Sequence, residues 1–178
     1  MKSSRAILTA IVIAIVVAAA WFMFRRGSGE RVDLMTTFDQ AEKRGQFTVA
    51  DATLAGETKK AIVAPPNGRI TFHVKVPDDG WLKVWLGLKP EAWTIEGNGV
   101  HFYAGVSDGR AYETLFTQTI NPFANTAERR WIPVTVDLSA YAGEEINIIL
   151  NTLSSLPPAA PDDRGDMPLW GAPEVVKR

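Results

Sequence analysis

The two histidines of the sequence, His73 and His101, are the first side chains to consider for catalysis, because imidazole exchanges protons near neutral pH. Each lies in a strand-like pattern, on the face opposite the apolar residues. A catalytic histidine needs a nucleophile or a metal as partner, and none stands at a suitable spacing. The sequence contains no cysteine and no glycine-rich phosphate loop. We therefore expect no enzymatic activity and no cofactor.

Three aspartates near the C-terminal end, Asp162, Asp163 and Asp166, could offer carboxylate oxygens to calcium. Their spacing does not match the twelve-residue loop of an EF-hand. A solvated acidic loop is the simpler interpretation. We expect no metal site and keep these three residues as weak calcium candidates.

Tryptophan supplies the best candidates for a binding surface, namely Trp81, Trp85 and Trp93. Exposed aromatic side chains mark sites that stack on sugar rings or that contact another protein. Trp81 and Trp85 alternate with Leu82 and Val84, so they should point away from the core. We predict that these three tryptophans form the binding surface.

Alternating apolar and polar residues indicate many short strands after residue 45. The pattern predicts strands at residues 69–76, 81–88, 99–106, 111–120, 131–138, 146–150 and 169–175. It predicts an all-β, antiparallel, jelly-roll-like sandwich over residues 46–178. The side chains expected in its core are Ile70, Phe72, Val74, Leu82, Val84, Leu86, Phe102, Val134, Val136, Ile146 and Ile148.

The sequence predicts a membrane anchor in the first part of the chain. Residues 6–24 are apolar and uncharged, and as a helix they would span about 30 Å of hydrocarbon. Residues suited to the membrane–water interface follow one another at its end: Trp21, Phe22, Phe24, Arg25 and Arg26. A cleaved signal peptide, with its cleavage site at residues 18–20, is the alternative. We expect residues 1–26 to form a single transmembrane helix and residues 27–45 to form a neck.

Alanine recurs every fourth residue in the predicted helix, at Ala6, Ala10, Ala14 and Ala18. Small residues at this spacing let two membrane helices approach closely, so this stripe predicts packing against another transmembrane subunit. The alternative is a lipid-facing surface in which alanine is simply common.

Charge excludes one class of partner. The net charge of −1 divides into +3 for residues 1–30 and −4 for the remainder. An acidic domain without clustered lysine and arginine is a poor ligand for phosphate backbones, so we expect no nucleic acid. The basic residues instead flank the apolar segment, where they would meet the lipid bilayer.

Two C-terminal segments resemble bacterial jelly-roll domains of the carbohydrate-binding-module type. Residues 131–150 contain the "DLSAYAG" turn between two strands, and residues 169–173 contain a "WG-x-P" final strand. The resemblance covers roughly residues 98–176 and implies a β-sandwich. Asp137, Ser139 and Gly143 suit the turn, since they can bond local amides and supply a left-handed residue.

The leading hypothesis is a non-catalytic, single-pass accessory subunit whose sandwich docks on a larger membrane complex. A bacterial photosynthetic reaction-centre–light-harvesting complex is one candidate host, although no residue specifies it. The alternative is a cell-surface carbohydrate-binding module. In both cases we expect the inner membrane of a bacterium, with the sandwich on the extracytoplasmic side.

Overall fold

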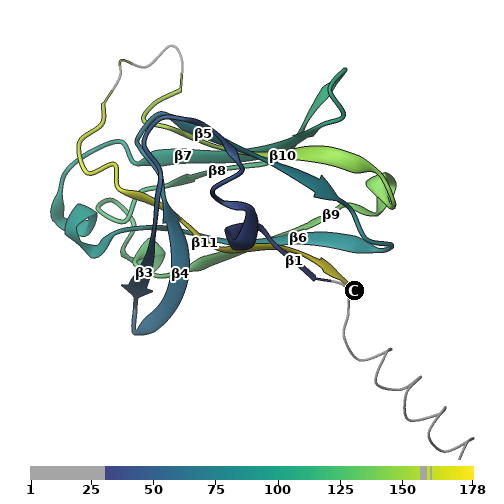
Figure 1. Cartoon of the computed structure of the whole chain (residues 1–178). Coiled ribbons are helices and arrows are strands. Elements are labelled where there is room, and N and C mark those ends of the chain that lie inside the picture. Colours follow the sequence, from purple (N-terminus) through teal and green to yellow (C-terminus); the bar gives the residue numbers. More distant parts are fainter. Residues whose placement is uncertain (1–30, 157–159, 161) are drawn as a thin grey trace, which may run out of the picture. The chain divides into compact units, whose positions relative to one another are not determined.

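The computed structural model describes residues 31–156, 160 and 162–178. These residues form two antiparallel sheets that lie face to face as two layers (Figure 1). The fold confirms the all-β sandwich predicted from the alternating pattern. Between residues 69 and 150, all of which are described, the only helical segments are 3-10 turns of three to five residues.

The first sheet has the strand order β3–β4–β11–β6–β9, with β1 beside β11. The second sheet has the order β2–β5–β10–β7–β8. The strands of the first sheet are β1 (Arg31–Asp33), β3 (Thr48–Leu54), β4 (Glu57–Val63), β6 (Gly80–Leu88), β9 (Ile132–Asp137) and β11 (Pro168–Lys177). Those of the second are β2 (Glu42–Arg44), β5 (Gly68–Lys75), β7 (Val100–Ser107), β8 (Tyr112–Ile120) and β10 (Glu145–Leu153). Four 3-10 helices connect them: η1 (Leu34–Thr37), η2 (Pro90–Thr94), η3 (Thr126–Glu128) and η4 (Ser139–Tyr141).

The core lies between the two sheets, because alternate side chains of each strand point inward. Trp170 of β11 is fully buried, and its ring packs edge-to-face on Phe102 of β7, with 5.0 Å between ring centroids. Nine of the eleven predicted core residues are buried. Val134 and Val136 are half-buried instead, because β9 is the edge strand of its sheet.

The sandwich already includes residues 31–45, which precede the predicted start at residue 46. Residues expected in the neck form β1, which pairs with β11, and β2, which pairs with β5. Both strands are three residues long, too short to show an alternating pattern. The predicted transmembrane segment, its alanine stripe and its interfacial residues lie outside the described residues. Within the described part of the chain, no helix has the length and apolar character needed to cross a membrane.

The turn after β9 forms as its sequence predicts. Ser139 donates its backbone N–H to the carboxylate of Asp137 at 2.8 Å, and Gly143 adopts a left-handed φ of 78°. The Tyr141 hydroxyl donates to the Glu113 carboxylate on β8 at 2.5 Å, and this bond raises the pKa of Tyr141 to about 12. The turn therefore ties the end of the first sheet to the second sheet.

A second apolar cluster covers part of the outer face of the first sheet. Trp131 is 3% exposed, and its indole N–H donates to the backbone oxygen of Glu57 at 2.9 Å. The ring lies over Gly171, where an added Cβ would come within 2.8 Å of Trp131 Cζ3. Glycine therefore makes room for the indole.

Gly171→Ala should lower the free energy of unfolding by about 1–3 kcal/mol, because the methyl group would push the held indole out of position. Denaturant unfolding would measure it. In a Trp131→Ala background the same change should cost almost nothing. Equal costs in the two backgrounds would show that the indole does not limit this position.

Candidate functional site

The outer face of the second sheet is polar and carries side chains that could bind a ligand by hydrogen bonds. On β5, Arg69 and His73 alternate with the buried residues Ile70 and Phe72. On β7, Tyr103 alternates with core residues in the same way. Since alternate residues of a strand share a face, the sheet brings these side chains to one surface.

A groove of about 210 Å³ lies on this face, across β2, β5, β10 and β7. We call it the Tyr103 groove. Its lining residues are Arg44, Asn67, Gly68, Arg69, Tyr103, Asn151, Thr152 and Leu153. The set combines one aromatic ring with guanidinium, amide and hydroxyl groups, so it can contact an apolar surface and polar atoms of the same ligand.

Asn151 is the most constrained polar group of the Tyr103 groove. It is 2% exposed, and its Oδ1 accepts a hydrogen bond from Nε of Arg69 at 2.8 Å. Because Arg69 can only donate, this contact fixes the orientation of the amide. Its Nδ2 is buried without a partner among the described residues. A buried donor left without a partner costs about 1–3 kcal/mol.

The rim of the groove is held by its own hydrogen bonds. Thr152 donates its hydroxyl to the backbone oxygen of Pro65 at 2.8 Å and accepts from the N–H of Gly68 at 3.2 Å. The side-chain amide of Asn67 donates to the Ser154 hydroxyl at 3.0 Å and accepts from the Ser154 N–H at 3.1 Å. These contacts fix the polar side chains before any ligand binds, which reduces the entropic cost of binding.

Aromatic side chains continue from the groove along β7 and β8. His101 lies next to Tyr103, with 6.0 Å between ring centroids. On the other side, Tyr112 lies over Gly105, where an added Cβ would come within 2.4 Å of its ring. Tyr112 remains 47% exposed, and burial of the rest raises the pKa of its hydroxyl.

The two histidines occupy this face without forming a catalytic pair. His73 Nδ1 lies 3.2 Å from Asn147 Oδ1, and its Nε2 lies 3.5 Å from Glu145 Oε2. His101 Nδ1 lies 3.0 Å from the Thr119 hydroxyl, and partial burial lowers the pKa of its imidazole. The expectation that neither histidine is catalytic remains a prediction.

The three predicted tryptophans do not form one surface. Trp81 lines a groove of about 270 Å³ with Lys83, Thr135, Val176 and Arg178, on the outer face of the first sheet. The guanidinium of Arg178 lies over its ring, 5.0 Å from the centroid. The indole N–H of Trp81 is buried without a hydrogen-bond partner among the described residues.

Trp85 and Trp93 pack instead against the cluster around Trp131. The ammonium group of Lys59 lies over the Trp85 ring, 4.0 Å from its centroid, and Trp93 donates its indole N–H to the backbone oxygen of Leu88. Cations cover the faces of Trp81 and Trp85 and compete with any sugar for those faces. We therefore place the candidate site at the Tyr103 groove.

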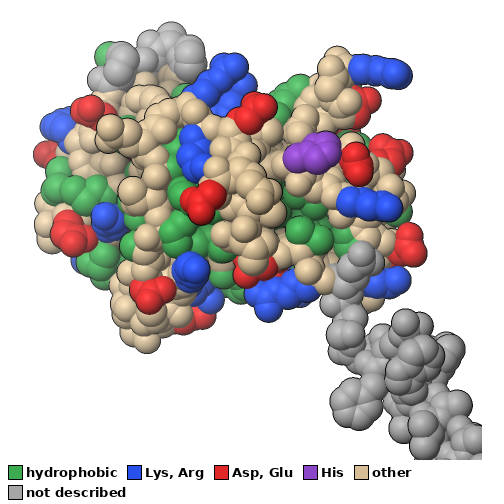
Figure 2. All heavy atoms as spheres, viewed as in Figure 1, with side chains coloured by type: hydrophobic (Ala, Val, Ile, Leu, Met, Phe, Trp, Pro, Cys, Tyr) green, Lys and Arg blue, Asp and Glu red, His purple; other side chains and the backbone are tan. Residues whose placement is uncertain are grey.

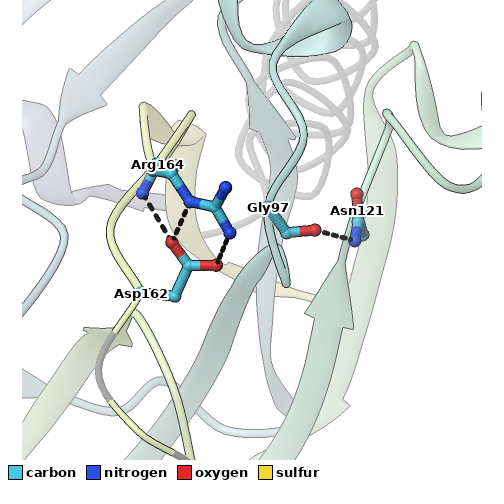
Figure 3. Close-up of polar contacts among 4 residues, drawn as sticks. All are labelled: Gly97, Asn121, Asp162 and Arg164. Atoms are coloured by element: carbon cyan, nitrogen blue, oxygen red, sulfur yellow. Dashed lines mark hydrogen bonds and ion pairs between the residues drawn. The ribbon is translucent and has the colours of Figure 1, made fainter.

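Loops tied together by polar contacts close one end of the sandwich. The guanidinium of Arg164 binds both carboxylate oxygens of Asp162, at 2.8 and 2.9 Å (Figure 3). Nearby, the Asn121 side chain donates to the backbone oxygen of Gly97 at 2.9 Å (Figure 3). Asp162 is thus engaged by an internal cation rather than left free as a metal ligand.

Asp166 is the exceptional carboxylate of this loop. It is 7% exposed, and neither of its oxygens has a partner among the described residues. Burial raises the pKa of Asp166 to about 7, and the charges of Asp162 and Asp163 add to the effect. No three histidine or carboxylate groups in the described ranges converge on one point as metal ligands would.

Charges of both signs are interspersed over the visible face of the molecule, with apolar patches between them (Figure 2). None of the described ion pairs includes Arg44 or Arg69, the two cations of the Tyr103 groove. The groove therefore contains two guanidinium groups that form no ion pair with the described residues.

The prediction from sequence missed the Tyr103 groove. The prediction rested on tryptophans, whereas the groove has a tyrosine, and most of its lining residues come from four strands far apart in the sequence. Two signals were present. Arg69 and Tyr103 each alternate with core residues, and Gly105 interrupts a strand, which often marks a close approach of another group.

No protein-family model matches the sequence. An uncharacterized protein of Archaeoglobus fulgidus is 36% identical over 108 residues, which are 60% of this chain. The chain covers only 26% of that relative. This match therefore supports common ancestry over the aligned region and gives no activity.

Solved structures give a clearer result for the fold. The CBM51 domain of a Clostridium perfringens GH95 protein, in complex with methyl-galactose, aligns over 82% of this chain and 99% of its own, with a TM-score of 0.53 and 16% identity. This chain has the β-sandwich fold of carbohydrate-binding modules. TmCBM61, in complex with β-1,4-galactotriose, aligns over 82% of this chain and 94% of its own (TM-score 0.51, 14% identity). The K2 cleaved adhesin domain of Lys-gingipain aligns over 85% of this chain and all of its own, with a TM-score of 0.51 and 12% identity. At these identities the likeness establishes the fold alone.

Proposed function

We propose that this chain is a non-catalytic glycan-binding module that residues 6–24 tether to a membrane. The observation that carries the proposal is the Tyr103 groove, where an aromatic ring stands beside Arg69, whose guanidinium is oriented by its hydrogen bond to Asn151 Oδ1. The C–H face of a pyranose packs on an aromatic ring, and its hydroxyls accept hydrogen bonds from planar amide and guanidinium groups. The groove offers both kinds of contact.

Binding without catalysis agrees with the lining of the groove. Hydrolysis of a glycosidic bond usually requires two carboxyl groups on opposite sides of the bond, about 5–9.5 Å apart. Among the residues that the structure describes, those that line the Tyr103 groove include no carboxylate. A glycan bound in the groove would therefore contact none of the carboxyl groups that such hydrolysis uses.

The fold also favours glycan binding over the hypothesis of an accessory subunit. The similar domains were solved with methyl-galactose and with β-1,4-galactotriose, so the same sandwich supports sugar binding in those proteins. Neither the fold nor the comparisons support docking on a membrane complex, and a photosynthetic host has no support from them. We therefore prefer the sugar-binding alternative.

The tether rests on the sequence of residues 6–24, which are apolar, and on Arg25 and Arg26 directly after them. A module held in this way would act at the outer surface of its membrane and retain soluble or cell-wall glycans there. Effective concentration at a surface would compensate for weak single-site affinity.

Tyr103→Ala should weaken glycan binding about 10- to 100-fold, because it removes the ring on which a sugar stacks. The full chain, in a detergent without a sugar headgroup, would first be screened against neutral and acidic oligosaccharides that include β-1,4-galactotriose. Isothermal titration with the best ligand would then compare the wild type and the variant.

Trp81→Ala is the matched control, since it removes an aromatic ring from the opposite face of the sandwich. Its affinity should equal that of the wild type. Loss of binding in Trp81→Ala and retention in Tyr103→Ala would place the sugar on the first sheet and reject the Tyr103 groove. Thermal unfolding of both variants would verify that the sandwich is intact.

A further inference from the structure

Two arginines meet at one side of the Tyr103 groove. Arg44 of β2 and Arg69 of β5 are directly opposite each other in the pairing of these strands. Side chains in this relation lie on the same face with Cβ atoms about 4.5–5.5 Å apart, and like charges placed there repel. An isolated pair of this kind is unfavourable unless an anion lies between or beside the two groups.

The protein itself supplies no such anion in the residues that the structure describes. Arg44 and Arg69 make none of the described ion pairs, and the one described partner of the Arg69 side chain is the uncharged Asn151. Glu42, two residues before Arg44 on β2, is exposed and also makes none of those ion pairs. Two guanidinium groups are thus left to face a ligand.

Guanidinium groups bind carboxylates through pairs of parallel N–H···O bonds, so they select planar anions over neutral hydroxyl groups. Arg69 is half-buried and its Nε is already fixed by Asn151, so its remaining N–H groups are oriented in advance. The cations lie beside Tyr103 in the same groove. One sugar ring could therefore stack on Tyr103 while a group attached to it reaches the arginines.

We propose that the Tyr103 groove selects acidic glycans, with the carboxylate of a uronic acid residue held by Arg44 and Arg69. This inference rests on the proposed glycan-binding function and specifies its ligand class. The domains similar in fold whose ligands are named above were solved with neutral galactosides, so an acidic ligand would distinguish this chain from them.

The test compares sugars that differ only in carrying a carboxylate or, at the same carbon, a neutral hydroxymethyl group. Oligosaccharides of galacturonate, glucuronate and mannuronate would each be titrated into the full chain beside their carboxyl-reduced counterparts. At least one acidic oligosaccharide should bind ten or more times tighter than its reduced counterpart, and its affinity should fall as salt rises.

Arg44→Gln and Arg69→Gln should each remove most of this preference, and Arg69→Lys should restore only part of it, because an ammonium group lacks the planar fork. Lys75→Gln is the matched control, a cation removed from the same strand outside the groove. It should bind as the wild type does.

Equal affinity for acidic and reduced sugars, unchanged in Arg44→Gln and Arg69→Gln, would overturn the charge selection and leave glycan binding intact. Preference for sulfated sugars over uronates would also overturn the carboxylate assignment. Failure of every glycan to bind, or binding insensitive to Tyr103→Ala, would reject both this inference and the proposed function.

Discussion

Trp170→Ala should lower the free energy of unfolding by about 3–5 kcal/mol, the largest effect expected of any single core substitution in this chain. The side chain is fully buried between the sheets, and its ring packs edge-to-face on Phe102 and Phe116. It lies on β11, which pairs with β1, β4 and β6. Removing the indole would open a cavity at the centre of the sandwich, and denaturant unfolding would measure the cost.

Trp170→Phe separates loss of volume from loss of the indole N–H. That N–H has no hydrogen-bond partner among the described residues, so phenylalanine keeps most of the packing and removes an unsatisfied donor. We expect it to cost less than about 1.5 kcal/mol. A similar cost for both variants would mean that the indole nitrogen has a partner which the packing argument omits.

Asp166→Asn should increase the free energy of unfolding at pH 8 by about 2 kcal/mol. It should also remove most of the dependence of that free energy on pH between pH 4 and 7. Burial raises the folded-state pKa of Asp166 from 3.8 to about 7. Between these two values the folded chain keeps a proton that the unfolded chain has lost. The free energy of unfolding of the wild type should therefore fall as pH rises from 4 to 7 and level off above 7.

Thermal and denaturant unfolding at pH 4, 6 and 8 would measure this linkage. Asp51→Asn is the control, since Asp51 is exposed and is not among the charges that shift the pKa of Asp166. If Asp166→Asn destabilised the chain at pH 8, the ionised carboxylate would need a favourable partner. Stabilisation of the wild type by added calcium, absent in the variant, would identify that partner as a metal ion.

The sequence predicted the strands of the sandwich well because most of them alternate strictly between core and solvent. Residues 69–76 became β5 within one residue at each end, and residues 81–88 became β6 with one added residue. The "WG-x-P" segment lies in β11 as expected. In these segments the local pattern and the tertiary packing agree, so periodicity alone was sufficient.

The parts that sequence did not predict depend on contacts between distant residues. β1 and β2 are stabilised by pairing with β11 and β5, which no local pattern reveals. The Tyr103 groove depends on the placement of β10 between β5 and β7, which brings Asn151 beside Arg69 and Tyr103. The positions of the tryptophans did not reveal the candidate site either. Neighbouring cations and loops decide whether an aromatic ring is open to a ligand, and these neighbours are distant in the sequence.

Backbone amide shifts in an NMR titration of the full chain, in a detergent without a sugar headgroup, would show whether a glycan binds in the Tyr103 groove. The ligand would be the tightest-binding oligosaccharide of the screen. We expect shifts at residues 68–69, 103–105 and 151–153, with the indole N–H signals of Trp81, Trp85 and Trp93 unmoved. Shifts confined to those indoles, or to the loop of residues 162–167, would contradict this expectation.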